Sequence, residues 1–228
     1  MSDGILFDVF RCWSNSIIFA RRYFLIFSKK MNASHWLLVL FWIIYYVLHS
    51  VLAATSVKLF FNKIFGKLFR FYRLGYSIFV TITLIILLKY QYSFFSPTLI
   101  DVPLLKYFSM VLLVVPGAWI MFISVKKYFL LLSGIRSVYQ ASPKAELKVN
   151  GIHRFVRHPL YSGTILFVWG LFFVFPMLNN LIAVLLLTGY VLIGIGFEEK
   201  KLIREFGKQY ENYKSKIPAL IPKINLRK

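Results

Sequence analysis

The chain has 228 residues, of which 59% are apolar and 19% aromatic, and its 28 Lys and Arg against 8 Asp and Glu give a formal net charge of +20. The apolar residues lie in long runs without charge, which excludes a soluble enzyme and indicates a protein embedded in lipid. The basic residues gather between these runs, as they do beside an anionic membrane surface, so nucleic acid is not an expected partner.

Residues 1–34 precede the first apolar run and mix Phe and Ile with Arg. This composition favours a helix that lies in the membrane interface, with an additional crossing as the alternative. The runs at 36–57, 74–88 and 107–125 are long enough, or can be extended by snorkelling of flanking basic side chains, to cross the bilayer. The sequence therefore predicts three crossings before residue 126, the first of which contains His49.

The last apolar run, residues 159–197, is too long for one crossing, because it would extend about 58 Å as a helix. Proline and paired asparagines at 176–180 favour a turn, so we expect a helical hairpin and five crossings in total. Small residues would allow its two arms to approach closely. Those residues are Gly163 and Gly170 on one arm and Gly189, Gly194 and Gly196 on the other.

The loops assign a side of the membrane to each end of the bundle. Segments 58–73, 126–158 and 198–228 fall on one side and hold 21 of the 28 basic residues. Cytosolic loops carry the excess of Lys and Arg, so these three segments are predicted to face the cytoplasm. The predicted fold is thus an all-α, integral membrane helical bundle with about five transmembrane helices, a C-terminal hairpin and an amphipathic tail helix.

A polar stretch leads into the fourth predicted crossing and ends in Arg157, His158 and Pro159. Proline suits the first position of a helix, where an amide donor would lack a partner anyway, so we expect the helix to begin there. Tyr161 follows His158 by three residues and should lie on the same side of the first turn. These residues are candidate ligands of a small molecule; the alternative is that Arg157 and His158 only contact lipid headgroups.

The tail at 198–217 has the periodicity of an amphipathic helix. Among its charged residues, Glu199 alone projects to the middle of the apolar face, while Glu198 lies near the edge and could be only a solvated charge. A carboxylate held against apolar surface needs a cation, which Arg157, Arg136 or a ligand could supply. The predicted apolar face comprises Leu202, Ile203, Phe206, Tyr210, Tyr213 and Ile217.

Common signatures of cofactor and metal sites are absent. The sequence has no glycine-rich dinucleotide or phosphate-binding loop. One cysteine and four scattered histidines do not form a metal site at a recognisable spacing. A cofactor would therefore have to bind in another kind of architecture.

Three motifs nevertheless resemble a known superfamily. Residues 157–163 have the pattern R-H-P-x-Y-x-G, residues 198–213 the pattern E-E-x-x-L-x-x-x-F-G-x-x-Y-x-x-Y, and residues 217–222 the pattern I-P-x-x-I-P. This combination resembles the C-terminal half of the isoprenylcysteine carboxyl methyltransferase and phospholipid methyltransferase superfamily. Upstream segments at 48–53, 72–76 and 134–136 are similar to the bacterial branch that includes methanethiol S-methyltransferases and NnrU-like proteins.

The resemblance implies an integral membrane enzyme that uses S-adenosyl-L-methionine without a Rossmann domain. A methyltransferase domain would span residues 35–228, with its cofactor-binding part at 126–222. His158 and Tyr161 would contact the cofactor, and Glu199, with Glu198, would meet its amino group or the residues that hold it. Arg157 would face the cofactor carboxylate or the acceptor, which makes His158 and Arg157 the candidate catalytic residues; Arg136 is a further candidate for cofactor binding.

The methyl acceptor remains open at this stage. The resemblance favours a lipophilic acceptor, as in isoprenylcysteine carboxyl methyltransferases. A small thiol such as methanethiol is the alternative, and it would need a base such as His158 to form the thiolate. A non-enzymatic membrane protein that binds lipid headgroups is the alternative from a different class.

Overall fold

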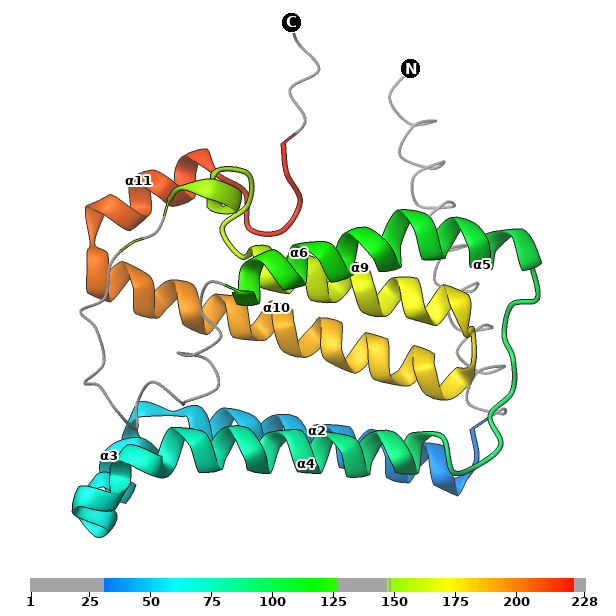
Figure 1. Ribbon diagram of the computed structural model, residues 1–228, viewed down its shortest axis with the longest axis horizontal. Coiled ribbons are helices and arrows are strands. Elements are labelled where there is room, and N and C mark those ends of the chain that lie inside the picture. The colour runs from blue at the N-terminus through cyan, green and yellow to red at the C-terminus, as the bar shows by residue number, and fades with distance from the viewer. Residues whose placement is uncertain (1–30, 127–146, 148, 224–228) are drawn as a thin grey trace, which may run out of the picture.

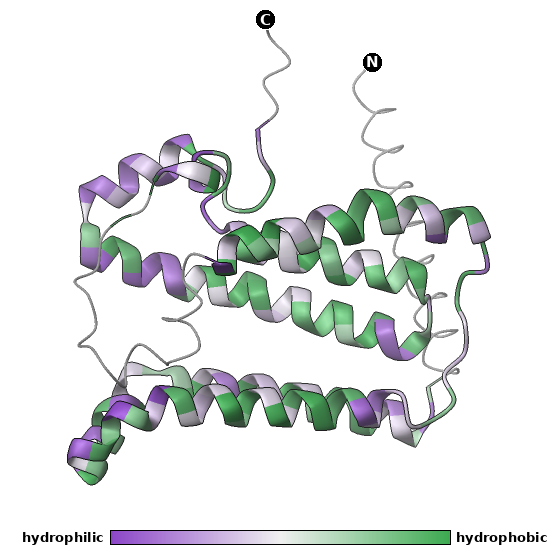
Figure 2. Ribbon diagram, viewed as in Figure 1, coloured by the Kyte–Doolittle hydropathy of each residue, from purple (hydrophilic) through white to green (hydrophobic). Residues whose placement is uncertain are grey.

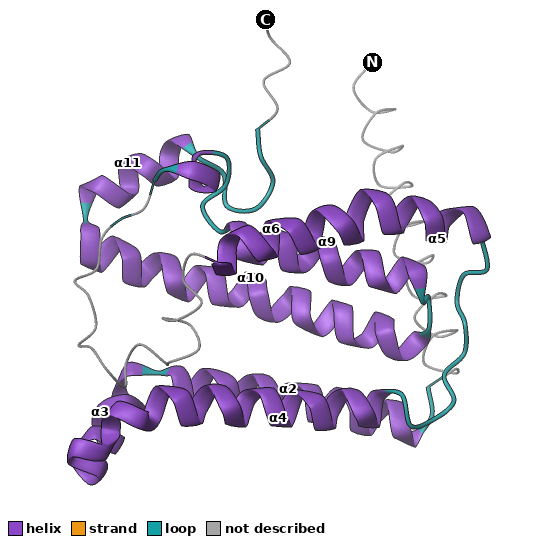
Figure 3. Ribbon diagram, viewed as in Figure 1, coloured by secondary structure: helices purple, strands orange, loops and turns teal. Residues whose placement is uncertain are grey.

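The computed structural model describes residues 31–126, 147 and 149–223, and these form helices joined by loops and turns (Figures 1 and 3). The extended segments pair only at one isolated bridge, between Thr98 and Met177, within these ranges. The all-α prediction is confirmed. The predicted interfacial helix at 1–30 and the candidate residue Arg136 lie outside the described residues.

The first crossing is α2 (Ala33–Ala53), which begins where the side chain of Asn32 accepts a hydrogen bond from the amide of His35. It ends at Ala54, whose extended backbone separates it from α3 (Thr55–Phe65). A short 3₁₀ helix, η1 (Gly66–Phe71), then leads into α4 (Tyr72–Gln91). The predicted crossing at 36–57 is therefore displaced by a few residues toward the N-terminus.

The third crossing is a rod made of α5 (Pro103–Ser109), the π-helical segment η2 (Met110–Val114) and α6 (Val115–Lys126). Pro116 has no amide hydrogen to donate to the carbonyl four residues earlier, and a widened π turn accommodates this missing bond.

The predicted hairpin consists of α9 (Pro159–Val174) and α10 (Leu178–Phe206), which run side by side in Figure 1. The asparagines expected in the turn, Asn179 and Asn180, lie instead in the first helical turn of α10, where both are buried. The turn itself is thus shorter than the sequence indicated.

The tail is not the single helix expected at 198–217. Helix α10 continues without a break through Glu198 and Glu199 to Phe206. Gly207 then adopts φ +53°, a backbone conformation that residues with a side chain rarely adopt, and α11 (Lys208–Lys216) starts in a new direction. Glycine at this position therefore divides the tail into two helices, although the predicted apolar face remains at least half-buried.

Within the described ranges, four helical stretches are long and apolar enough to cross a membrane: Ala33–Ala53, Thr55–Gln91, Pro103–Lys126 and Leu178–Phe206. Helix α9 is a shorter apolar helix of 16 residues, about 24 Å long. Large apolar side chains such as Ile86, Val111 and Ile193 are about 60% exposed on the outside of the bundle. This surface is suited to lipid, and Figure 2 shows that polar residues gather instead at the end formed by α10 and α11.

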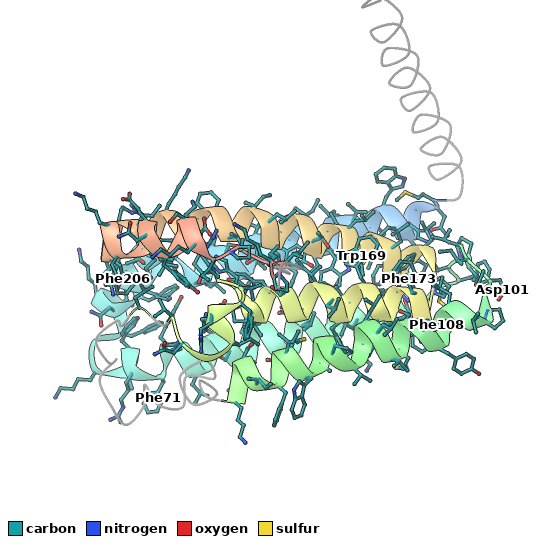
Figure 4. The ribbon with its side chains drawn as sticks, turned by 90° about the horizontal axis from the view of Figure 1, so that it is seen from above. Phe71, Asp101, Phe108, Trp169, Phe173 and Phe206 are labelled. Atoms are coloured by element: carbon teal, nitrogen blue, oxygen red, sulfur yellow. The ribbon has the colours of Figure 1, made fainter. Side chains whose placement is uncertain are left out.

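The helices form two packed groups. Helix α2 packs on α4 and α10, while α6 lies along α9. Trp169 and Phe173 of α9 lie on the side of α10 in Figure 4, and the Trp169 indole donates a hydrogen bond of 3.1 Å to Thr188. Figure 4 also places Asp101 and Phe206 at opposite ends of the molecule.

The predicted glycine contact between the hairpin arms is wrong. A Cβ atom on Gly163 would lie 2.9 Å from Ile120 of α6, and one on Gly170 would lie 2.8 Å from Val114 of η2. Gly117 of α6 is equally close to α9, because a Cβ atom there would lie 2.6 Å from the Phe167 amide nitrogen. The small residues therefore allow α9 to approach the third crossing. A Cβ atom added to any of the α10 glycines, at 189, 194 and 196, would have no neighbour within 4 Å.

A buried polar network fixes the end of the bundle farthest from α11. Gln91 accepts a hydrogen bond from Trp42 at 3.1 Å and donates to Asn180 at 2.9 Å. Asn179 donates to the carbonyl of Gln91 at 2.7 Å, and its amide donates to Ser96 at 2.9 Å. These bonds connect α2, α4 and α10, and they satisfy polar groups that would be costly to leave unpaired in an apolar environment.

Candidate functional site

The candidate site lies where α9 begins, α10 ends and α11 folds back. A short 3₁₀ helix, η3 (Gly151–Arg154), precedes it. His158 is the N-cap of α9 and Pro159 opens the helix, as the sequence predicted. Both arms of the hairpin therefore contribute residues from the same end.

Glu199 is the centre of this site and is 7% exposed. The Arg157 guanidinium donates to its Oε1 through Nε at 2.9 Å and also through a terminal nitrogen. Nε2 of His158 lies 3.3 Å from the same oxygen, and Nζ of Lys214 lies 2.8 Å from Oε2. The protein itself thus supplies the cation that the sequence analysis expected beside Glu199, mainly as Arg157.

Arg157 also holds the tail in place. Its remaining terminal nitrogen donates to the carbonyl oxygens of Lys214, at 3.1 Å, and of Ile217. Only 8% of its side chain is exposed. These carbonyls belong to the last turn of α11 and its C-cap, where helical partners are missing, so a cation is favourable there.

Backbone hydrogen bonds align the segment after α11 with the segment before α9. The amides of Arg157 and His158 donate to the carbonyls of Pro218 at 2.9 Å and Ala219 at 3.0 Å. The Ser162 hydroxyl donates to the carbonyl of Leu220 at 2.7 Å. The chain following α11 is therefore anchored to the start of α9 at three successive residues.

Glu198 occupies a different environment from Glu199. Its Oε2 lies 3.7 Å from Nδ1 of His158. This oxygen is buried and has no hydrogen-bond partner among the described residues. The Tyr161 ring stacks near the His158 ring, with centroids 5.6 Å apart, and its hydroxyl lies within electrostatic reach of the Glu198 carboxylate. A buried acceptor oxygen without a donor is a place where a ligand cation fits.

Two tyrosines of α11 close the site from the outside. Tyr213 donates a hydrogen bond to the carbonyl of His153 at 2.6 Å. Tyr210 is 1% exposed. Burial and the neighbouring Glu199 carboxylate raise the pKa of Tyr210 to about 12, because both disfavour a phenolate. The Tyr210 hydroxyl is therefore neutral at physiological pH.

The structure brings together five of the six candidate residues: Arg157, His158, Tyr161, Glu198 and Glu199. The sixth, Arg136, lies outside the described residues. Sequence reasoning missed Lys214 and Ser162. Lys214 projects to the solvated side of the tail helix, and its long side chain reaches Glu199 while remaining 43% exposed. No cluster of metal-binding type occurs in the described part of the chain.

Comparison with known proteins finds similarity in this region. Residues 105–209 match the model of a family described as phospholipid methyltransferase. The match covers 105 of the 228 residues, so the similarity to phospholipid methyltransferases concerns this part of the chain. The matched residues run from α5 into α11 and include the 157–163 motif with His158 and the part of the 198–213 motif that contains Glu199.

Several curated proteins similar to this chain are enzymes. A methanethiol S-methyltransferase of Crocosphaera subtropica is 36% identical over 100 residues, covering 41% of this chain and 38% of that protein. Methanethiol S-methyltransferase 2 of Bradyrhizobium diazoefficiens is 32% identical over 104 residues, covering 42% and 39%. A protein-S-isoprenylcysteine O-methyltransferase of Schizosaccharomyces pombe is 36% identical over 81 residues, covering 34% of each chain.

The alignments with these relatives therefore span less than half of each protein. No solved structure matches the chain. The superfamily and the bacterial branch indicated by the sequence motifs are confirmed as distant homology.

Proposed function

We propose that the protein is an integral membrane methyltransferase that takes its methyl group from S-adenosyl-L-methionine. The observation that carries the proposal is the buried carboxylate oxygen of Glu198, which lacks a donor and lies beside His158 and Tyr161. A donor with a cationic amino group and a sulfonium matches this acidic, aromatic-lined position. Its homology to methyltransferases supports the same reading.

The residues divide into two groups under this proposal. Glu198, His158 and Tyr161 hold the donor, because Oε2 of Glu198 is buried without a hydrogen-bond partner among the described residues and lies beside the His158 and Tyr161 rings. Glu199 and Arg157 position them, because their charged groups are already occupied by each other and by α11. Arg157 therefore acts through the tail, and a direct contact with the cofactor carboxylate is not required of it.

The bound donor supplies an activated methyl group, whose transfer is an in-line displacement. Positive charge disappears from sulfur in the transition state, so the protein must mainly align the reactants and exclude water. The closed ends of α9 and α10, covered by Tyr210 and Tyr213, are suited to that task. Little acid–base chemistry is needed at the donor itself.

We further propose that the acceptor is a thiol rather than a carboxylate. Methanethiol S-methyltransferases from several bacteria are among the relatives, compared with a single isoprenylcysteine enzyme. This favours the alternative acceptor over the lipophilic carboxylate that the sequence motifs first indicated. The excess of basic residues in segments 58–73, 126–158 and 198–228 supports a site that faces the cytoplasm.

The test uses the full chain in detergent or nanodiscs. Binding of S-adenosyl-L-methionine is measured by calorimetry, and transfer of the labelled methyl group is followed in volatile and lipid extracts with methanethiol added. Glu198→Gln and His158→Ala should weaken binding at least tenfold. Glu205→Gln, which changes an exposed acid on the same helix, is the matched control and should not.

Two results would reject the proposal. The first is the absence of binding to the wild-type protein under conditions where it remains folded. The second is binding that Glu198→Gln and His158→Ala leave unchanged. Label found only in the lipid extract would retain the methyltransferase and overturn the thiol acceptor.

A further inference from the structure

A second polar cluster lies between α2, α4 and α10. Tyr76 of α4 contacts Nδ1 of His49 on α2, at 2.5 Å, and the two rings stack with centroids 5.7 Å apart. Tyr190 of α10 completes the cluster: its ring lies 6.1 Å from that of His49, and its hydroxyl bonds Ser50 at 3.0 Å. Three helices that are distant in sequence thus converge on one histidine.

The contacts of Tyr76 select one tautomer of His49. The Tyr76 hydroxyl also donates to the backbone carbonyl of His49 at 3.2 Å, and a carbonyl can only accept. With the single hydroxyl proton directed to this carbonyl, Nδ1 is the donor in its bond with Tyr76. The lone pair of the neutral ring is then on Nε2.

His49 lines an apolar cavity of about 320 Å³ between α2 and α4. This volume is suitable for a small organic molecule. Wall residues such as Phe41, Ile44 and Ile86 are 39 to 60% exposed on the outer surface of the bundle. A lipophilic molecule could therefore enter from the bilayer and meet an imidazole inside. The cavity is lined by Phe41, Ile44, Tyr45, Leu48, His49, Phe79, Val80, Thr83, Ile86, Leu87 and Tyr90.

Tyr190 lies near residues of both the cavity and the donor site. The Tyr161 hydroxyl lies within electrostatic reach of both Glu198 and Tyr190. Tyr190 thus lies beside His49 and also within electrostatic reach of Tyr161, which stacks near His158. His158 is poorly placed to act as a base, because its two ring nitrogens face Glu198 and Glu199 at 3.7 and 3.3 Å.

We propose that His49 is the general base that deprotonates the acceptor thiol, and that Tyr76 is the positioning residue that fixes its tautomer. The inference rests on the proposed thiol methyltransferase function and extends it to the acceptor side. The thiol proton moves to Nε2 of His49. The thiolate forms the new bond to the methyl carbon, and the electron pair of the broken bond stays on the donor sulfur, which leaves neutral. His49 later releases its proton to water.

The proposal predicts that the need for His49 depends on the acidity of the thiol. The thiolate is the nucleophile, and it is scarce for an alkanethiol at neutral pH, whereas an acidic arylthiol is already ionised. The experiment compares butanethiol with pentafluorothiophenol as acceptors of the full-length enzyme. His49→Gln should slow butanethiol methylation about 100-fold or more, which is the usual contribution of a general base, and should slow pentafluorothiophenol less than about tenfold.

Tyr76→Phe should show the same pattern with a smaller loss, since the imidazole remains but its tautomer is no longer fixed. Tyr72→Phe is the matched control. Tyr72 lies one turn earlier on α4, and its hydroxyl donates to the carbonyl of Leu52 at 2.8 Å without touching His49. Binding of S-adenosyl-L-methionine, measured in every variant, reports whether the protein is folded. If His49→Gln does not bind, His49→Asn is used in its place.

The outcomes separate this inference from the proposed function. A wild-type enzyme that binds the donor but methylates neither thiol overturns the thiol acceptor. If the wild-type enzyme methylates both thiols and the His49 variants lose neither rate, or lose both rates equally, only the role of His49 as base is overturned. A selective loss with butanethiol supports it.

Discussion

The replacement Arg157→Lys tests how the site and the tail depend on each other. Arginine uses its planar fork to reach both the Glu199 carboxylate and the carbonyls of Lys214 and Ile217. Lysine keeps the charge but has one compact ammonium group, which cannot reach both partners at once. We therefore expect α11 (Lys208–Lys216) to detach while the membrane hairpin stays folded.

The size of the effect follows from the burial of the pair. The side chains of Arg157 and Glu199 are 8% and 9% exposed, so their interaction is weakly screened by water. Removing one partner of a buried ion pair costs about 3 to 5 kcal/mol. We take the lower end, about 3 kcal/mol, because the lysine retains its charge and Lys214 still contacts Glu199. This corresponds to roughly a 100-fold change in the ratio of docked to detached tail.

Hydrogen exchange in nanodiscs measures this ratio directly. Amides of Lys208–Lys216 should exchange about 100-fold faster in Arg157→Lys, whereas amides of α9 should be unchanged. Arg154→Lys is the control, because Arg154 is exposed and its conversion leaves the Glu199 site intact. Equal protection of α11 in Arg157→Lys and wild-type protein would refute the idea that this guanidinium fixes the tail.

Three further predictions concern packing, the buried network and pH. Gly117→Val should lower the free energy of unfolding by about 1 to 3 kcal/mol, since its Cβ would lie 2.6 Å from the Phe167 amide nitrogen. Gly194→Val should change it little, because a Cβ there would have no neighbour within 4 Å. Thermal unfolding in detergent compares the two variants. Asn179→Ala should cost about 1 to 3 kcal/mol by leaving buried partners unsatisfied, measured in the same assay against wild type. Because folding raises the pKa of Tyr210 from 10.0 to about 12, docking of α11 should be unaffected below pH 10 and weaken as pH rises from 10 to 12. Tyr210→Phe should reduce that loss, and limited proteolysis of α11 at pH 9 and pH 11 is the measurement.

Sequence alone predicted those parts of the site that depend on helical periodicity. Helix faces repeat every 3.6 residues, so the inward direction of Glu199 could be read from the apolar positions around it. Proline chemistry likewise placed the start of α9 at Pro159. The hairpin followed from length, because one crossing cannot use 39 residues.

Other features could not be predicted because periodicity gives a face but not its partner. The glycines of α9 were assigned to the wrong neighbour for this reason, since α6 and α10 are equally compatible with the sequence. Arg157 was expected at a ligand, whereas its donors are taken by Glu199 and by α11, 57 to 60 residues further along the chain. The break at Gly207 depends on a positive φ angle that glycine permits but does not require.

The anchoring of the last segment also has a consequence for biosynthesis. Arg157 precedes the final two crossings, while the carbonyls of Lys214 and Ile217 that it binds follow them. A nascent chain halted at Phe206 would contain both membrane arms, but the Arg157 guanidinium would lack the two carbonyls that it binds in the tail. Docking of the tail around Arg157 therefore follows insertion of the two membrane arms, and a product truncated at Phe206 should insert without completing these bonds.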